Sequence, residues 1–123
     1  MFEDALNDFD KKNYVSARQK FNALKNTVSD DDSLYYEADF YLIECTLSEN
    51  NLNEAKSLLE SMLVDIRLPN SVLERVLVRL GQIHCSRNDK KAATMHFTRL
   101  ADINPNSIYL KIANCDFINN SSK

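Results

Sequence analysis

The sequence contains very little glycine and proline, with one Gly and two Pro in 123 residues. An average protein has roughly 7% Gly and 5% Pro. Sheet proteins use both residues repeatedly in tight turns, so their scarcity favours helices joined by short polar loops. Asparagine, which tolerates turn conformations, is concentrated at the expected loops. The composition therefore predicts an all-helical chain.

Long apolar runs are also missing. No stretch reaches the roughly 18–20 apolar residues that a membrane-spanning helix needs, so we expect no membrane insertion. The net charge of −3 is mild and the basic residues are scattered. Because nucleic-acid-binding proteins carry a basic patch or stripe, we expect no nucleic-acid partner. A chain of 123 residues, 44% of them hydrophobic, suits a single domain with its own core.

The three cysteines, Cys45, Cys85 and Cys115, show no close spacing. An odd number of separated cysteines argues against a disulfide framework, so we expect buried thiols in a reducing compartment. The acidic N-terminus does not have the pattern of a signal peptide. We therefore expect a cytoplasmic location. The alternative is a periplasmic location, which requires that a targeting segment was removed.

Reactive residues do not converge in the sequence. His84 and Cys85 are adjacent, and neighbours on a helix point about 100° apart, so they are poorly placed for a catalytic dyad. The cysteines and histidines lack the short paired spacing of zinc ligands. A single glycine excludes a Gly-rich phosphate loop. We expect no enzyme activity, no metal and no cofactor.

Three segments share one pattern, an alanine followed four residues later by a large apolar residue. The alanines lie 38 residues apart each time (55 − 17 and 93 − 55), and a polar break precedes each of them. A fixed period is the sequence signature of a repeat architecture. The pairs are Ala17 with Phe21, Ala55 with Leu59, and Ala93 with Phe97.

The third segment carries the most complete version of this pattern. It contains Leu77, Leu80, Gly81, His84, Ala93, Phe97 and Pro105. These residues and their offsets resemble the tetratricopeptide (TPR) repeat. In that family Gly81 and Ala93 would lie where the two helices of a hairpin cross closely and only small side chains fit. Ile43 stands in the glycine position of the second unit, so we expect a wider crossing there.

The resemblance implies an all-α, right-handed α-solenoid of about three TPR hairpins with a C-terminal capping helix. The period of 38 residues, against 34 in the standard repeat, is similar to that of bacterial envelope TPR proteins such as the Tol–Pal-associated cell-division coordinator. One TPR-like domain is expected at 1–118, with repeats at about 1–32, 33–70 and 71–106, the capping helix at 107–118 and a disordered tail at 119–123.

Apolar periodicity and polar breaks also predict the individual helices. Ser71 and Glu74 have the spacing of a capping box, which predicts that the fifth helix begins at residue 71. The acidic residues at 30–32 suit the start of the third helix. The helices before the capping helix are expected near 2–12, 14–27, 33–49, 51–66, 71–87 and 89–102.

The resemblance further implies a non-enzymatic protein–protein interaction module or adaptor, which holds a peptide or helix of a partner in a concave groove. Arg75 and Arg79 would pair with a partner carboxylate there, or with Glu74 or Asp39 if this face is only solvated. The apolar groove residues are alternatively ordinary core. The groove positions implied by the register are Phe9, Phe40, Glu44, Leu47, Arg75, Val78, Arg79 and Gln82.

Two further functions remain open at this point. The chain is alternatively a self-associating structural scaffold, a homo-oligomer whose size depends on concentration, or the TPR domain of a larger envelope-assembly protein. A full clamp for a peptide carboxylate is not expected, because Phe2, Leu6 and Tyr41 stand where the Lys and Asn donors of TPR clamps are found. The sequence does not identify the partner.

Overall fold

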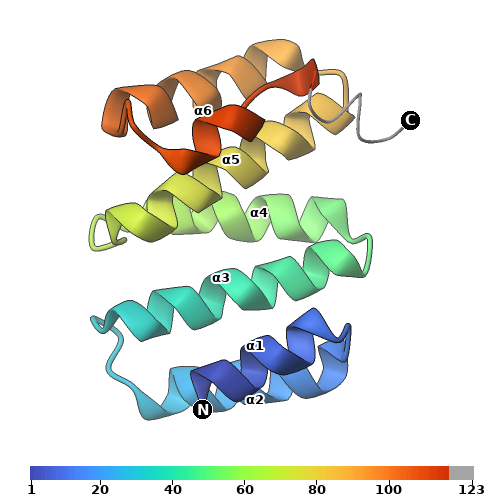
Figure 1. The fold of residues 1–123 in the computed structure, drawn as a ribbon, viewed down its shortest axis with the longest axis vertical. Helices are drawn as coiled ribbons and strands as arrows, with labels where there is room; N and C mark the ends of the chain where they lie inside the picture. The colour runs from blue at the N-terminus through green and yellow to red at the C-terminus, as the bar shows by residue number, and fades with distance from the viewer. Residues whose placement is uncertain (117–123) are drawn as a thin grey trace.

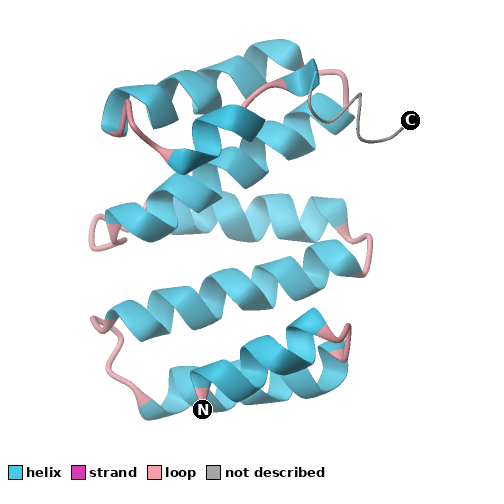
Figure 2. Ribbon diagram, in the orientation of Figure 1, coloured by secondary structure: helices cyan, strands magenta, loops and turns pink. Residues whose placement is uncertain are grey.

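The computed structural model describes residues 1–116, which form α-helices and one short 3₁₀ helix and contain no strand (Figure 2). The prediction of an all-helical chain is confirmed for these residues. The elements are α1 (Phe2–Asp10), α2 (Tyr14–Thr27), α3 (Ser33–Ser48), α4 (Leu52–Leu63), α5 (Asn70–Ser86), α6 (Lys90–Ile103) and the 3₁₀ helix η1 (Ile108–Ile112).

Each helix packs mainly against its neighbours in the sequence, so that the helices follow one another along the long axis of the molecule (Figure 1). Helices α1 and α2, α3 and α4, and α5 and α6 are each joined by a short turn. Helix α3 also contacts α5, and η1 lies against α5 and α6. This arrangement brings α1, α3, α5 and η1 to a common face, which carries the candidate site described below.

The three short turns share one backbone conformation. Lys12, Asn50 and Asn88 have positive φ angles of 65°, 62° and 60°, in the left-handed region usually occupied by glycine. The next N–H in each turn bonds to the carbonyl five residues earlier, as in a Schellman motif. These bonds join Asn13 to Asp8, Asn51 to Thr46, and Asp89 to His84. The 38-residue period of the sequence is therefore also a period of the backbone.

The repeated alanines and their apolar partners all lie in the core. Ala17, Ala55 and Ala93 are fully buried, as are Phe21 and Leu59. A Cβ atom added at Gly81 would collide with the ring of Phe97, so the predicted close crossing of α5 and α6 is confirmed. Where Ile43 replaces the glycine, α3 and α4 pack less extensively, in agreement with a wider crossing.

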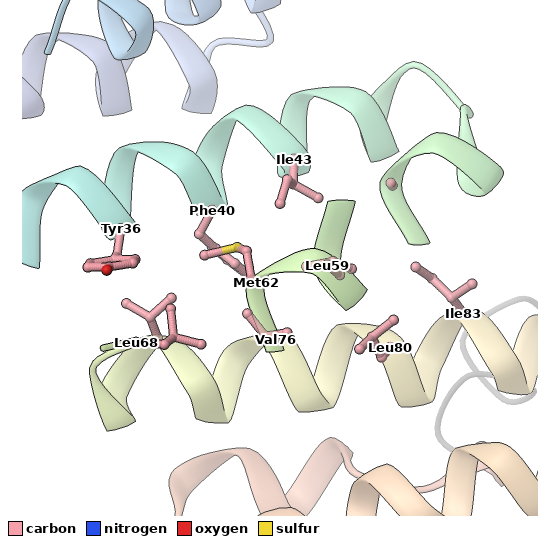
Figure 3. Packing of buried hydrophobic residues seen from close by; sticks show 11 residues of the cluster. Tyr36, Phe40, Ile43, Leu59, Met62, Leu68, Val76, Leu80 and Ile83 are labelled. Atoms are coloured by element: carbon pink, nitrogen blue, oxygen red, sulfur yellow. The ribbon is translucent and has the colours of Figure 1, made fainter. Parts of the chain in front are cut away.

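The largest core cluster joins α3, α4 and α5 in the middle of the molecule (Figure 3). Tyr36 and Phe40 of α3, Leu59 and Met62 of α4, and the apolar face of α5 are all buried there. Complete burial of one large apolar side chain contributes about 1.5–3 kcal/mol. This cluster therefore fixes α3 and α5 relative to each other, and these two helices provide most of the candidate site.

The predicted capping helix at 107–118 is wrong in type and length. Residues Ile108–Ile112 form a 3₁₀ helix, and Ser107 Oγ accepts a hydrogen bond from the Tyr109 amide at 3.2 Å. Tyr109 and Ile112 are three residues apart, as are Leu110 and Ala113, and all four pack against the buried cluster of α5 and α6. In a 3₁₀ helix, with three residues per turn, side chains three apart point in the same direction, so each of these pairs faces the cluster together. Residues 117–118 and the predicted tail at 119–123 lie outside the described residues.

The predicted capping box at the start of α5 is also not formed. The residue that precedes the helix is Pro69, with φ at −61°, and Ser71 lies inside the first turn. Proline presets the chain for helix entry, so α5 begins immediately after it. Glu74 accepts a hydrogen bond from Asn104 Nδ2 at 3.2 Å, which fastens the end of α6 to α5 instead.

The prediction of three thiols is wrong for two of the cysteines. Cys85, at the end of α5, forms a disulfide with Cys115, which lies 30 residues further along the chain. Cys45 is a free and fully buried thiol. The number and spacing of the cysteines did not indicate the pair, because only the return of the chain across α5 and α6 brings Cys115 beside Cys85.

Candidate functional site

The common face of α1, α3, α5 and η1 contains a hollow of about 350 Å³, called here the main hollow. Helices α3 and α5 supply most of its walls. Six of the eight residues predicted for a partner-binding groove line it, and they come from three helices. These are Phe9, Phe40, Glu44, Arg75, Val78 and Arg79.

A second hollow of about 320 Å³ adjoins the first and is called here the side hollow. Leu47 and Gln82, the two remaining predicted residues, line it together with Glu44 and Arg79. Because Glu44 and Arg79 border both hollows, all eight predicted residues fall on one continuous surface, called the groove below. The register of the repeat was therefore sufficient to place them together.

Arg75 is held on the groove wall by both its charge and its flat guanidinium group. The guanidinium lies 5.0 Å from the centre of the Phe40 ring and donates a hydrogen bond to Glu37 Oε1 at 2.5 Å. Stacking over an aromatic ring adds a cation–π attraction. Burial is the largest single influence and disfavours the charge of Arg75, but the hydrogen bond to Glu37, the charge of Glu37 and smaller nearby contributions together outweigh it, so the pKa of Arg75 is raised.

Arg79 joins the two hollows. Its Nε donates to Glu44 Oε1 at 2.6 Å and its Nη1 donates to Gln82 Oε1 at 2.7 Å. Glu44 is buried, with 9% of its surface exposed, whereas the Arg79 side chain is 37% exposed. Arg79 therefore keeps part of its guanidinium accessible from the groove while it neutralises a buried carboxylate.

The predicted partners of these two arginines were wrong. Glu74 accepts from Asn104 and Asp39 accepts from Lys25, so neither carboxylate holds an arginine. Glu37 and Glu44 hold them instead, because both carboxylates project from α3 toward α5. The groove therefore does not contain two unbonded arginines that could receive a partner's carboxylate.

The apolar groove residues are of two kinds. Phe40 and Val78 are only 3% and 1% exposed, so these two residues belong to the core, as the alternative interpretation held. Phe9 and Leu47 are half-buried and remain in reach of a ligand. The groove thus has an apolar floor made by the core and a rim with paired charges.

Sequence reasoning missed the contribution of η1 to the groove. Tyr109 and Ile112 line the main hollow, together with Tyr41 and Asp10. The sequence assigned residues 107–118 to a cap over the last hairpin, and a cap has no reason to reach the groove. Residues three apart share one side of a 3₁₀ helix and also of an α-helix, so the spacing of Tyr109 and Ile112 did not distinguish the two.

A further hollow of about 390 Å³ lies between α2, α3 and α4. Four of its polar side chains are paired with one another. Asp65 accepts from the Tyr36 hydroxyl at 2.9 Å and from Arg67 Nε at 3.3 Å, and Arg67 also pairs with Asp30. The groove, by contrast, brings together all eight residues predicted for a partner-binding surface, so we take the groove as the candidate site.

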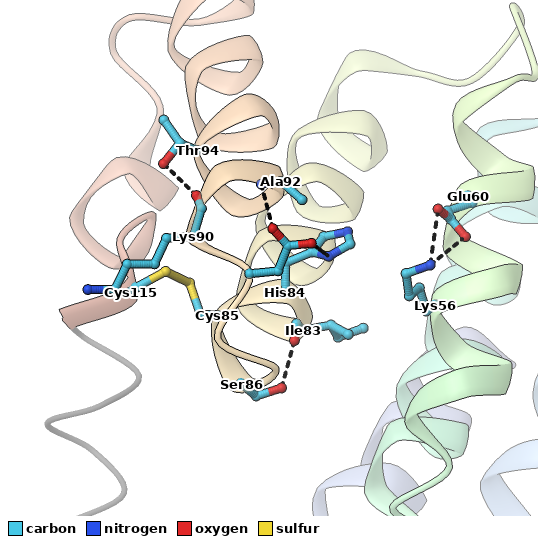
Figure 4. Close-up of polar contacts among 11 residues, drawn as sticks. Lys56, Glu60, Ile83, His84, Cys85, Ser86, Lys90, Ala92, Thr94 and Cys115 are labelled. Atoms are coloured by element: carbon cyan, nitrogen blue, oxygen red, sulfur yellow. Dashed lines mark hydrogen bonds and ion pairs between the residues drawn. A yellow bond between two sulfur atoms is a disulfide. The ribbon is translucent and has the colours of Figure 1, made fainter.

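The histidines do not form a reactive centre with the cysteines. His84 stacks on His96 with ring centres 5.3 Å apart. His84 also lies 3.9 Å from Asp89 Oδ2, while Cys85 is held in the disulfide (Figure 4). Within residues 1–116, no cluster of three or more His, Cys, Asp or Glu residues is arranged to hold a metal ion. No helix in this range is long and apolar enough to cross a membrane.

Comparison with known proteins gives no relative for this chain: no protein-family model, no curated protein and no solved structure matches it.

Proposed function

We propose that the chain is a TPR-type repeat protein, an α-solenoid of three hairpins, which binds a segment of another protein in the groove. The repeat assignment is supported by the turns at Lys12, Asn50 and Asn88, which recur every 38 residues. It is also supported by the buried small residues at the helix crossings, such as Gly81. In TPR proteins the first helix of each hairpin lines the binding surface, and here these are α1, α3 and α5.

One observation carries the binding proposal: all eight groove residues border two adjoining hollows. An apolar floor with a polar, partly accessible rim suits a short helix or an extended apolar segment, since apolar burial supplies affinity and the rim sets the register. The surface offers no unpaired cationic cluster, so a partner segment is not chosen by its carboxylates alone.

The test is a pulldown with variants that change the rim but preserve the fold. Arg79→Glu alone would place a second carboxylate beside that of the buried Glu44, so the charge-swapped double variant Glu44→Arg/Arg79→Glu is used because it restores the pair. Its helical spectrum and melting temperature should stay close to those of wild type. We expect recovery of the specific partner to fall by about tenfold or more, the equivalent of one lost hot-spot contact.

The matched control is Arg99→Glu, which changes an exposed arginine on α6 outside the groove. It should recover the partner as wild type does. Equal recovery by the charge-swapped variant and by wild type would show that the groove is not the binding surface. Phe40→Ala is unsuitable for this purpose, because truncation of a core aromatic costs about 3–5 kcal/mol and would disturb the fold itself.

For the cellular compartment of the chain, we propose the cytoplasm, with the periplasm as the alternative. The expected cytoplasmic location and the periplasmic alternative differ in what they imply for Cys85 and Cys115, because disulfides persist in the periplasm but are transient and redox-sensing in the cytosol. Trapping free thiols in intact cells with a maleimide, followed by mass spectrometry, distinguishes the two. Predominantly alkylated Cys85 and Cys115 would support the cytoplasm, and predominantly protected cysteines the periplasm.

A further inference from the structure

Residues 105–115, called here the strap, form one wall of the groove. Tyr109 and Ile112 line the main hollow from the strap side, and Val78 forms part of its floor. The same two strap residues also pack, with Leu110 and Ala113, on the buried cluster that contains Val78. The strap therefore covers an apolar surface that continues directly from the groove floor.

Besides this packing, the amides of Asn106 and Ser107 donate hydrogen bonds to Asn104 at the end of α6 and hold the start of the strap. Ile108 is 77% exposed, and the hydrogen bond from the Tyr109 amide to Ser107 lies within the strap itself. A five-residue 3₁₀ helix has little stability of its own. The Cys85–Cys115 disulfide ties the far end of the strap to the end of α5 (Figure 4). The covalent bond thus secures the far end of a segment that is held at its start by the bonds to Asn104 and in its middle by partly buried side chains.

We propose that the Cys85–Cys115 disulfide is a redox latch on the groove. Its reduction releases the strap from α5 and α6, and the uncovered surface beside Val78 accepts a partner segment with the apolar pattern of the strap, Tyr-Leu-x-Ile-Ala. The side chains of the strap that pack on this surface indicate the kind of segment that the surface can bind. The choice of occupant rests on the proposed function of the groove, whereas the release of the strap does not.

The reductant is a dithiol. One of its thiolates attacks Cys115 Sγ, the bond between the two sulfurs breaks, and Cys85 leaves as a thiolate that takes a proton from water. The second thiolate of the reductant then attacks the mixed disulfide, and Cys115 is released and protonated. Two electrons pass to the protein, which gains two thiols, and the reductant becomes a disulfide.

The surroundings favour attack at Cys115. It is half-buried and lines a hollow of about 310 Å³ with Lys90 and Phe97, whereas Cys85 is only 4% exposed. Cys45 does not compete, because it lies fully buried in the cluster of α1, α2 and α3. Burial raises the pKa of the Cys45 thiol, which keeps it protonated and a poor nucleophile.

The test compares the oxidised full chain with the chain reduced by dithiothreitol. Backbone amides of residues 108–113 should exchange hydrogen about tenfold faster or more after reduction, while those of α1 to α4 keep their rates. The chain contains no tryptophan, so a Tyr109→Trp variant provides a single reporter. Its emission should shift to longer wavelength on reduction. Unchanged exchange and unchanged emission would overturn the latch.

A labelled synthetic peptide with the sequence of residues 105–114 tests the uncovered surface. It should bind the reduced chain and the Cys115→Ser variant, and not the oxidised chain; equal binding to oxidised and reduced chain would overturn the assignment of the occupant. Cys45→Ala is the control and should respond to reduction as wild type does; loss of the response would contradict the assignment to Cys85 and Cys115. None of these measurements uses the natural partner, so a failure of the pulldown above remains distinguishable from a failure of the latch.

Discussion

At the scale of single residues, the three positions with positive φ end the first helix of each hairpin with different chemistry. Asn50 and Asn88 have short polar side chains, which reduce the penalty of the left-handed region by local hydrogen bonding. Lys12, with φ at 65°, lacks this compensation. The sequence had indicated asparagine as the replacement for glycine in these turns, and the structure confirms it at two of the three positions.

Lys12→Gly should therefore stabilise the protein by about 0.5–1.5 kcal/mol, because glycine enters the left-handed region without a Cβ penalty. Urea unfolding followed by circular dichroism measures the change. Lys11→Gly is the matched control: Lys11 has φ at −84°, where glycine has no advantage, and this variant should lose stability. A lower unfolding midpoint for Lys12→Gly would contradict the role given to this turn.

At the scale of the elements, α5 and α6 contact each other at two places along their length. Small residues allow a close approach at one place, and two histidine rings stack at the other. Phe97 fills the space left by Gly81, and His84 stacks on His96 with an angle of 14° between the rings. Burial lowers the pKa of His96, and the charge of His84 lowers it further. Glu60 acts in the opposite direction, while Arg99 and Lys56 add to the lowering.

This shift predicts a loss of stability in mild acid. The folded state disfavours protonated His96, so the unfolded chain binds more protons once the pH falls through the ordinary histidine pKa of 6.5. The contribution of His96 to stability is thus complete above that pH and decreases below it. The melting temperature should fall between about pH 7.5 and about pH 5.5.

His96→Gln should reduce this fall, because glutamine does not titrate. Met95→Gln, at a 67% exposed neighbouring position, is the control and should keep the pH dependence of wild type. If the melting temperature of His96→Gln decreases as steeply as that of wild type, another group causes the acid sensitivity.

At the scale of the whole molecule, local and periodic features were predictable from the sequence. The bounds of α2 agree with the prediction at both ends, since Asn13 and Val28 end the apolar periodicity there. The groove residues follow from the same register. Features that depend on how distant segments meet were not predictable, among them the pairing of Arg79 with Glu44 and the Cys85–Cys115 bond.

The burial of individual groove residues also depends on the assembled fold. Phe40 and Leu47 lie on the same face of α3, about two helical turns apart. The sequence gives no reason to expect a different burial for the two side chains. The structure separates them because α4 and α5 cover Phe40, whereas Leu47 lies in the last turn of α3 and borders the side hollow. The position of a residue in the repeat therefore predicts the helix face on which its side chain lies, but not how exposed that side chain is.

The central claim is that the surface between α3 and α5 contacts the partner, and photo-crosslinking in cells tests it most directly. A p-benzoylphenylalanine residue is introduced in place of Gln82 in the groove and, separately, in place of Met95 on the exposed side of α6. The account predicts that irradiation yields a covalent adduct with one partner protein from position 82 and none from position 95. An adduct from position 95 without one from position 82 would contradict it.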